Sequence, residues 1–176
     1  MRELVLGGVR SGKSRYAEQQ ARASGLRVVY IATAIAAGDA ELEERVRRHR
    51  AYRPAEWTTV EEPAALGTAL RAHAGDGSCL LVECLTLWLA HLLTSGSPDR
   101  LESERASLLR AVEEIPGRLI LVSNETGLGI MPTGELGRRF LDVAGELHQC
   151  LAAACDRVTL VVAGLPQRLK EVSHDR

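Results

Sequence analysis

The sequence predicts an α/β fold in which helices flank a mostly parallel central sheet, and three observations lead to this prediction. Short apolar runs alternate along the chain with longer helical patterns, which is typical of a parallel sheet covered by helices. Residues 7–14 read GGVRSGKS and match the pattern G-x-x-x-x-G-K-[ST] of a phosphate-binding loop, which needs a strand before it and a helix after it. Both are expected here, because the run ELVL at residues 3–6 precedes the loop and a helix-forming segment follows it as far as Gly25.

Each remaining element is predicted from a local pattern. Short runs predict strands at residues 28–32, 58–60, 78–83, 119–123 and 159–163. Helical patterns predict helices at residues 40–52, 63–74, 85–93, 101–114 and 135–154. Asp39 can cap the first of these helices, Pro54 helps to end it, and Pro63 opens the second. Residues 95–99 (SGSPD) have the composition of a loop, and the helix before them is apolar on most sides, which indicates burial or a subunit contact.

The phosphate-binding loop indicates the first chemical function of the chain. Its glycines let successive backbone N–H groups curl around a polyphosphate at the positive end of the following helix. Lys13 would reach the β- and γ-phosphates, and Ser14 would offer its hydroxyl to the Mg²⁺ that the phosphates carry. Lys13 and Lys170 are the only lysines among 22 basic residues, so a lysine stands where this loop needs one. The alternative is a glycine-rich turn without a ligand.

Length and composition exclude several other classes. A length of 176 residues suits a single α/β domain spanning residues 1–176, because a domain of about 150 residues buries about 70% of its unfolded surface. A formal net charge of −1 and an aromatic content of 3% give little reason to expect a nucleic-acid partner. We expect no signal peptide before the first strand, and the longest apolar stretch, residues 85–93, is too short to span a bilayer. The protein is therefore expected to be cytoplasmic.

The four cysteines do not suggest a structural metal. They form no C-x-x-C pair and have no histidines at zinc-finger spacing. We expect them to be buried as small hydrophobic residues. They are Cys79, Cys84, Cys150 and Cys155.

Glu83 ends the apolar run of residues 78–83, and ligands of parallel sheets bind at the carboxyl ends of strands. A carboxylate there can hold Mg²⁺ beside Ser14, as the strand-end acid of phosphate-loop enzymes does. That acid is more often aspartate, and glutamate reaches one methylene further. The alternative is a carboxylate that caps the helix after the strand.

A basic cluster, RVRRHRAYR, occupies residues 45–53. Leu42, Val46 and His49 are spaced i, i+4 and i+7, so on a helix His49 shares a face with two apolar residues. One interpretation is a histidine packed against the body of the protein. The other is a nucleophile, because a neutral imidazole can attack an α-phosphate whose charge nearby arginines neutralise.

The segment NETGLGIMPTG at residues 124–134 follows a predicted strand and is rich in glycine. Its position at a carboxyl strand end favours a substrate loop or a lid. A plain connecting loop is the alternative.

Together, these segments resemble the bifunctional adenosylcobinamide kinase / adenosylcobinamide-phosphate guanylyltransferase family of cobalamin biosynthesis. The resemblance covers nearly the whole chain and rests on separate motifs in the same order, which makes it far more specific than the phosphate-binding loop alone. The motifs are GGVRSGKS from Gly7, YIATA from Tyr30, ERVRRHRAYRPAEW from Glu44, TVEEP from Thr59, LLVECLTLWLAHLL from Leu80 and LVSNETGLGIMP from Leu121.

The resemblance implies a RecA-like P-loop NTPase fold, a homotrimer and two activities. ATP or GTP phosphorylates the aminopropanol hydroxyl of adenosylcobinamide. GTP then donates GMP to adenosylcobinamide phosphate through a GMP–histidine intermediate, which gives adenosylcobinamide-GDP. His49 matches the guanylylated histidine, Lys13 is the second catalytic residue, and Ser14 and Glu83 are the expected metal ligands. The positions expected to contact nucleotide are Gly7, Gly8, Val9, Arg10, Ser11, Gly12, Lys13, Ser14, Ala32, Thr33, Ala34, Arg50, Ala51, Tyr52, Arg53, Glu61 and Glu83.

Two other classes of protein share some of these features. A RecA-like P-loop ATPase that acts on nucleic acid would have the same loop and strand-end acid, but it would be expected to have a basic surplus and more aromatic residues. A GTP-binding switch module would normally recognise guanine with an N-K-x-D segment, and neither Lys13 nor Lys170 lies in one.

Overall fold

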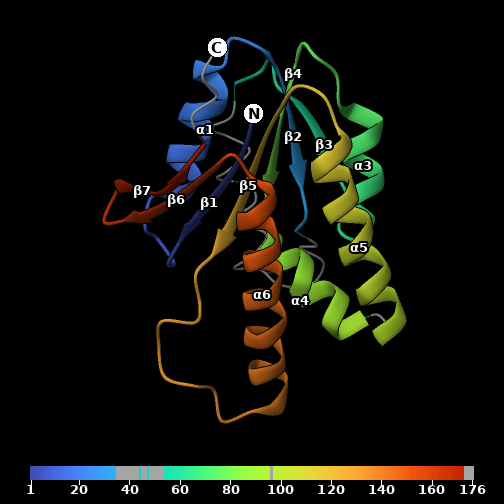
Figure 1. Cartoon of the computed structure of the whole chain (residues 1–176), viewed down its shortest axis with the longest axis vertical. Coiled ribbons are helices and arrows are strands. Elements are labelled where there is room, and N and C mark those ends of the chain that lie inside the picture. Colours follow the sequence, from blue (N-terminus) through green and yellow to red (C-terminus); the bar gives the residue numbers. More distant parts are fainter. Residues whose placement is uncertain (35–43, 45–46, 48–53, 96, 173–176) are drawn as a thin grey trace.

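The computed structural model describes residues 1–34, 44, 47, 54–95 and 97–172. Within these residues the strands form a seven-stranded sheet in the order β3-β2-β4-β5-β1-β6-β7 (Figure 1). The strands are β1 (Arg2–Gly7), β2 (Arg27–Ala32), β3 (Thr58–Glu61), β4 (Ser78–Glu83), β5 (Arg118–Asn124), β6 (Arg157–Val162) and β7 (Leu165–Glu171). The helices are α1 (Lys13–Ala23), α3 (Leu66–His73), α4 (Leu85–Ser95), α5 (Pro98–Glu114) and α6 (Glu135–Ala154). Neighbouring strands are parallel except β6 and β7, so the predicted mostly parallel sheet is confirmed.

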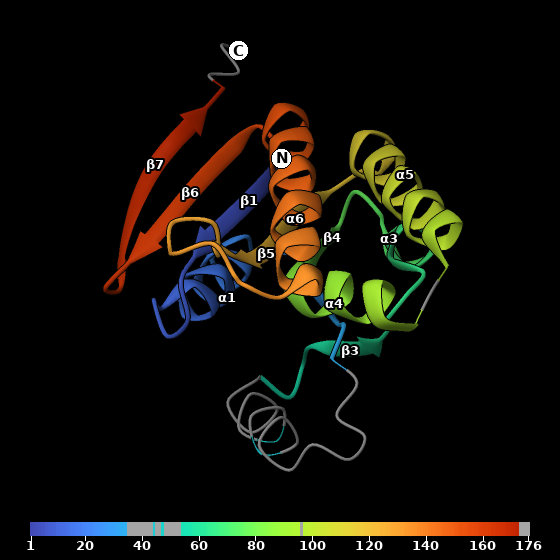
Figure 2. The same cartoon turned by 90° about the horizontal axis from the view of Figure 1, so that it is seen from below.

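Apolar layers cover both faces of the sheet. On one face, Leu4 and Leu6 of β1 pack with α3, α4, α5 and α6. The other face is covered by α1 (Figures 1 and 2), and there Val5 packs with Ala17 and Ala21 of this helix. Successive side chains of a strand point to opposite faces, and here both faces are buried. This double burial explains why the central strands are continuous apolar runs in the sequence.

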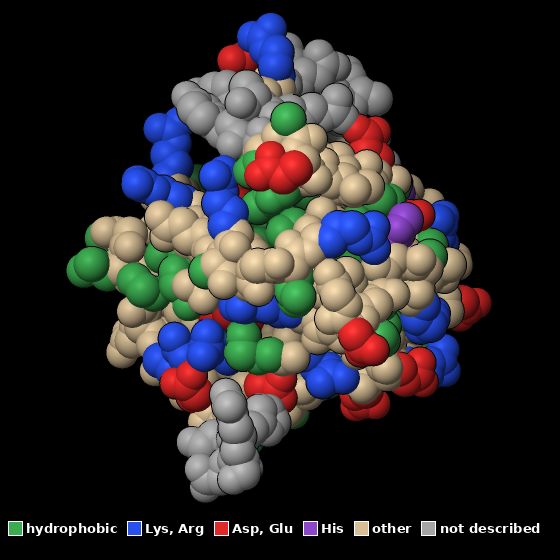
Figure 3. All heavy atoms as spheres, turned by 90° about the horizontal axis from the view of Figure 1, so that it is seen from above, with side chains coloured by type: hydrophobic (Ala, Val, Ile, Leu, Met, Phe, Trp, Pro, Cys, Tyr) green, Lys and Arg blue, Asp and Glu red, His purple; other side chains and the backbone are tan. Residues whose placement is uncertain are grey.

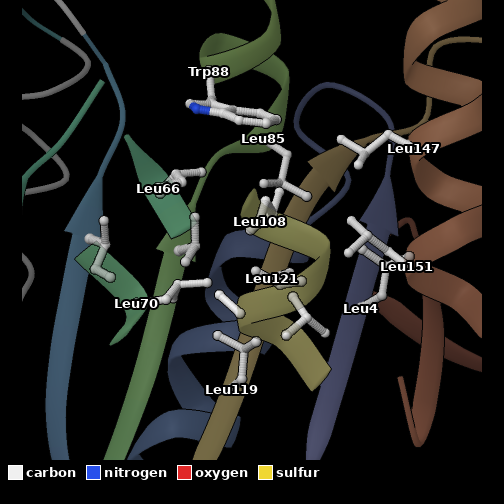
Figure 4. Packing of buried hydrophobic residues seen from close by; sticks show 14 of the residues in the cluster. Leu4, Leu66, Leu70, Leu85, Trp88, Leu108, Leu119, Leu121, Leu147 and Leu151 are labelled. Carbon is white, nitrogen blue, oxygen red and sulfur yellow. The ribbon is translucent and has the colours of Figure 1, made fainter. Parts of the chain in front are cut away.

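The thicker of the two layers is built around α4. Trp88 is fully buried and donates its indole N–H to the carbonyl oxygen of Ala64 at 2.7 Å. Leucines from the surrounding helices and strands point into the same layer in Figure 4: Leu4, Leu66, Leu70, Leu85, Leu108, Leu119, Leu121, Leu147 and Leu151. Of the two interpretations of this apolar helix, burial is therefore confirmed for Leu85, Trp88, Leu89 and Leu92.

Helices α3 and α5 pack closely where Gly67 of α3 faces Ser107 of α5. A Cβ atom on Gly67 would lie 2.5 Å from the carbonyl oxygen of Ser107, which is closer than real Cβ contacts come. Arg71 of α3 donates to Ser107 Oγ at 2.8 Å and fixes the same crossing. A glycine at position 67 is therefore required for this approach.

A buried carboxylate ties α1 to the sheet. Glu3 of β1 is fully buried and accepts hydrogen bonds from Tyr16 of α1 at 3.0 Å and Thr159 of β6 at 2.9 Å. Arg118 and Arg157 place guanidinium nitrogens 3.7 and 3.8 Å from its second oxygen. These contacts hold the helix that begins with Lys13 against strands β1 and β6.

The end of the sheet differs from the prediction. The predicted last strand, residues 159–163, is β6, and the antiparallel strand β7 follows it. Ala163 and Gly164 have φ values of 52° and 80° and form the turn between them, so Ala163 is not part of the strand. β7 was not predicted because it is an edge strand with mostly exposed side chains and carries no apolar alternation.

Two helices also begin elsewhere than predicted. Pro63 does not open α3, because Glu62 Oε1 accepts the N–H groups of Ala64 and Ala65 at 2.9 and 2.8 Å and holds a turn before the helix starts. α5 begins at Pro98 within the predicted loop, since the Ser97 side chain caps it by accepting from the Arg100 N–H. Serine followed by proline is a common helix start, and this pattern indicates the observed boundary better than composition did.

The cysteines are also buried less uniformly than expected. Cys79 and Cys155 are buried and Cys84 is half-buried, but Cys150 is exposed. It lies on α6, where the buried positions include Leu147 and Leu151, and an alanine-rich pattern did not indicate which side of the helix faces the sheet. None of the helices in the described segments combines the length and apolar character needed to cross a bilayer.

Candidate active site

The phosphate-binding loop connects β1 to α1 at the carboxyl edge of the sheet, which Figure 2 shows from below. Gly12 has a φ of 93° and stands at the N-cap of α1, where glycine adopts the left-handed conformation without strain. A Cβ atom on Gly7 would lie 2.6 Å from the carbonyl oxygen of Val161, so only glycine fits there. The loop thus directs the amino end of α1, where the helix dipole is positive, toward this edge.

The ammonium group of Lys13 lies over the loop. Its Nζ donates to the carbonyl oxygen of Gly8 at 3.2 Å, and the residue is only 8% exposed. The Lys13 N–H is also 3.4 Å from Ser11 Oγ. A buried cation at the start of a helix is suited to binding an anion, because its charge adds to the helix dipole.

Glu83 and Ser14 meet across the site. The Ser14 hydroxyl donates to Glu83 Oε1, and the Tyr30 hydroxyl donates to Glu83 Oε2 at 3.1 Å. The alternative role of Glu83, capping α4, is not supported by these bonds, because both carboxylate oxygens accept from side chains of α1 and β2. The end of β4 therefore presents a carboxylate to the phosphate-binding loop.

The ends of β2, β3 and β4 lie side by side, next to the contact between Ser14 and Glu83. Ala32 lies between Glu61 of β3 and Glu83 of β4. The Thr33 hydroxyl donates to the carbonyl oxygen of Cys84 and accepts its N–H, both at 2.8 Å. The predicted segment 32–34 thus adjoins the two strand-end carboxylates.

A polar chain that the sequence did not reveal lies under the end of β5. His148 Nε2 is 2.8 Å from Ser123 Oγ, and Thr86 Oγ1 is 3.4 Å from the same oxygen. Thr86 also accepts the N–H of Asn124 at 2.8 Å. Burial lowers the pKa of His148, which the negative charge of Glu125 partly opposes. Serine and threonine next to apolar runs carry no pattern that could have predicted this chain.

The remaining predicted site residues divide into two groups. Val9 and Arg10 are exposed on the loop, and residues 124–134 expose Leu128 and Ile130. The second group lies outside the described residues and comprises His49, Arg50, Ala51, Tyr52 and Arg53.

A phosphate-binding loop between the central strand and its helix, facing a strand-end carboxylate, defines a P-loop NTPase. Among solved structures, the RadB recombinase has a TM-score of 0.53 at 16% identity, with 90% of this chain and 73% of that chain covered. Protein PH0250 of Pyrococcus horikoshii has a TM-score of 0.53 at 12% identity, with 98% of this chain and 87% of that chain covered. At such low identity these likenesses concern the fold alone, and they confirm the RecA-like P-loop NTPase fold.

The chain belongs to the cobinamide kinase / cobinamide phosphate guanyltransferase family, whose model matches residues 3–169. It is 61% identical over 170 residues to the bifunctional adenosylcobalamin biosynthesis protein CobP of Pseudomonas aeruginosa, with 97% of this chain and 98% of that protein covered. It is 38% identical over 180 residues to the bifunctional adenosylcobalamin biosynthesis protein CobU of Escherichia coli, with 95% and 98% covered. The resemblance and the bifunctional transferase function are thereby confirmed, and the nucleic-acid ATPase and the GTP switch are not favoured.

Proposed function

We propose that this enzyme phosphorylates adenosylcobinamide with ATP or GTP and then transfers GMP from GTP to adenosylcobinamide phosphate through a covalent adduct on His49. The observation that carries the proposal is the convergence of Lys13, Ser14 and Glu83 at one edge of the sheet. A triphosphate bound along residues 7–14 would have its charge offset by the Lys13 ammonium group and the N–H groups at the start of α1.

Mg²⁺ fits the pair formed by Ser14 and Glu83. Both side chains supply oxygen donors, which this cation prefers, and their hydrogen bond brings the two oxygens together. Bound Mg²⁺ would supply charge neutralisation on the phosphates during transfer. The Tyr30 hydroxyl holds the other oxygen of Glu83 and so orients the carboxylate.

In our proposal, guanylyl transfer takes place in two successive displacement steps. A ring nitrogen of His49 attacks the α-phosphorus of GTP, a nitrogen–phosphorus bond forms, and pyrophosphate leaves. A phosphate oxygen of adenosylcobinamide phosphate then attacks the same phosphorus, and the nitrogen–phosphorus bond breaks. The positions 32–34, 50–53 and 61 would bind the nucleotide, as the family resemblance implies.

Three further proposals concern the whole molecule, and the family resemblance is the basis of the second. We propose that residues 1–176 act as one domain and that the enzyme assembles as a homotrimer. We also propose that it works in the cytoplasm, where its nucleoside triphosphate substrates are made.

The test of the function is incubation with adenosylcobinamide, GTP and Mg²⁺, followed by mass analysis of the corrinoid. We expect one product heavier by a phosphate and a later product heavier also by a GMP. An unchanged corrinoid, together with triphosphate hydrolysis that single-stranded DNA stimulates in a salt-dependent way, would favour the nucleic-acid ATPase instead.

Replacing Glu83 with glutamine should weaken Mg²⁺-dependent catalysis about 100-fold while leaving the fold intact, because the shape is kept and the charge is lost. The measurement is kinase activity titrated against Mg²⁺, together with thermal unfolding. Tyr30→Phe serves as the graded comparison, since it removes only the hydrogen bond to Oε2 and should cost about tenfold. If the Mg²⁺ dependence of Glu83→Gln matched that of the wild type, Glu83 would not be a metal ligand.

A further inference from the structure

Glu125 follows β5 directly, in the strand position next to the phosphate-binding loop. β5 pairs with β1 so that Asn124 lies opposite Gly7. The N–H of Glu125 then donates to the carbonyl oxygen of Gly7 at 3.1 Å. The residue that begins the phosphate-binding loop is therefore bonded to the residue that carries this carboxylate.

Among the described residues, the carboxylates that end β3 and β4 lie farther from β1 across the sheet. Neighbouring strands lie about 4.8 Å apart, so Glu61 on β3, four strands from β1, is displaced by about 19 Å across the sheet. Glu83 is two strands from β1 and is bonded to Ser14 and Tyr30. Glu125, by contrast, is one strand away and half-buried.

The position of Glu125 is fixed from two directions. Its Oε1 accepts the N–H of Gly127 at 2.7 Å, which holds a local turn directly after the strand. Beneath it, the Asn124 N–H is held by Thr86, and Ser123 is held by the buried His148. A carboxylate supported in this way loses little entropy when it engages a substrate.

We propose that Glu125 is the general base of the phosphoryl-transfer step and accepts the proton of the acceptor hydroxyl. The hydroxyl oxygen attacks the γ-phosphorus and forms the new oxygen–phosphorus bond. The bond from the γ-phosphorus to the β,γ-bridging oxygen breaks, and the nucleoside diphosphate leaves. The hydroxyl proton passes to a carboxylate oxygen of Glu125 and later to solvent.

The two activities of the enzyme place different demands on such a base. An alcohol must lose a proton when it becomes an ester of phosphoric acid. The acceptor of GMP is a phosphate monoester, whose second pKa is about 6, so at pH 8 it has already lost its proton. A base at residue 125 therefore serves the kinase step and has no proton to take in the guanylyl-transfer step.

The experiment compares both activities of Glu125→Gln at pH 8. Kinase activity is measured with adenosylcobinamide and a nucleoside triphosphate, and guanylyl transfer with adenosylcobinamide phosphate and GTP. We expect kinase kcat to fall about 100-fold with little change in the KM for nucleotide. Guanylyl transfer should stay within about twofold of the wild type.

Two further variants complete the design. Glu135→Gln removes an exposed carboxylate at the start of α6, at the other end of the segment that connects β5 to α6. This variant should leave both activities unchanged. In Glu125→Ala, added formate should restore part of the kinase activity, because a small carboxylate can enter the space and accept the proton.

Each outcome has a distinct meaning. Equal losses of both activities in Glu125→Gln, without rescue by formate, would show that Glu125 only supports the loop and would overturn the proposal. Wild-type kinase activity in Glu125→Gln would overturn it as well. The inference rests on the kinase activity, so a wild-type enzyme that did not phosphorylate adenosylcobinamide would refute the proposed function itself rather than the role of Glu125 alone.

Discussion

Replacing Lys13 with alanine is expected to lower kcat/KM for both phosphoryl transfer and guanylyl transfer by about 1,000-fold. The ammonium group donates a hydrogen bond to the carbonyl oxygen of Gly8, and Lys13 as a residue is buried. Both reactions begin with a triphosphate on residues 7–14, and both develop charge on phosphate oxygens that a buried cation stabilises more strongly than an exposed one. The measurement is steady-state kinetics of each activity, with nucleotide affinity determined separately.

Lys170→Ala is the matched control for this variant, because it removes the other lysine of the chain. Its Nζ donates to the carbonyl oxygens of Ala152 and Ala153, both at 2.9 Å, at the end of α6. We expect its activities to stay within about twofold of the wild type, with a loss of stability of about 1 kcal/mol from the helix terminus. Near-normal turnover of Lys13→Ala at saturating nucleotide would contradict the role of the loop lysine in catalysis.

His49→Asn is expected to abolish guanylyl transfer and to leave kinase activity. A kinase needs only in-line positioning of the acceptor hydroxyl and the γ-phosphate, whereas transfer through His49 requires a nucleophile at the α-phosphate. GTP labelled at the α-phosphate should tag the wild-type protein covalently, and GTP labelled at the γ-phosphate should not. The bond should be labile in acid and stable in alkali, as a phosphoramidate is. The tag should be absent from His49→Asn.

His91→Asn tests whether the tag is specific to one histidine. His91 lies half-buried on α4, with its ring close to the hydroxyl of Ser95, and we expect its variant to be tagged like the wild type. A tag that persisted in His49→Asn would refute His49 as the nucleophile. The search would then move to the other histidines of the chain, which are His73, His91, His148 and His174.

The central part of the site could be predicted from the sequence because it depends on local patterns. The glycines of residues 7–14 and the apolar run that ends at Glu83 identify the loop and the strand-end acid before any contact between them is known. The contact between Ser14 and Glu83 depends on the sheet order, in which only β5 separates β4 from β1. The family resemblance supplied the role of His49, which remains a prediction.

Other parts could not be predicted because they depend on pairing between distant segments. Tyr30 stands in the run VVYIA, where an aromatic residue indicates only a buried strand, yet its hydroxyl holds Glu83. Strand β7 has the composition of an exposed connection, and it forms a strand because it pairs with β6. The register that brings Glu125 to Gly7 follows from the pairing of β5 with β1, which no local pattern specifies.

The opposite end of the sheet, which Figure 3 shows from above, carries both signs of charge interspersed over its surface.

The position of β1 in the sheet determines when, during folding, the enzyme becomes able to bind nucleotide. β1 precedes every other strand in the chain, but both of its partners, β5 and β6, come from residues 118–162. The carbonyl oxygens of Gly7 and Ser11 likewise accept N–H groups from Glu125 and from Gly164 in the turn after β6. During synthesis, β1 therefore cannot pair with β5 or β6 until most of the chain has been made. Pairing between segments so far apart in the sequence is also slow. Nucleotide affinity thus reports the completed fold, and nucleotide that binds only this state stabilises the whole sheet by mass action.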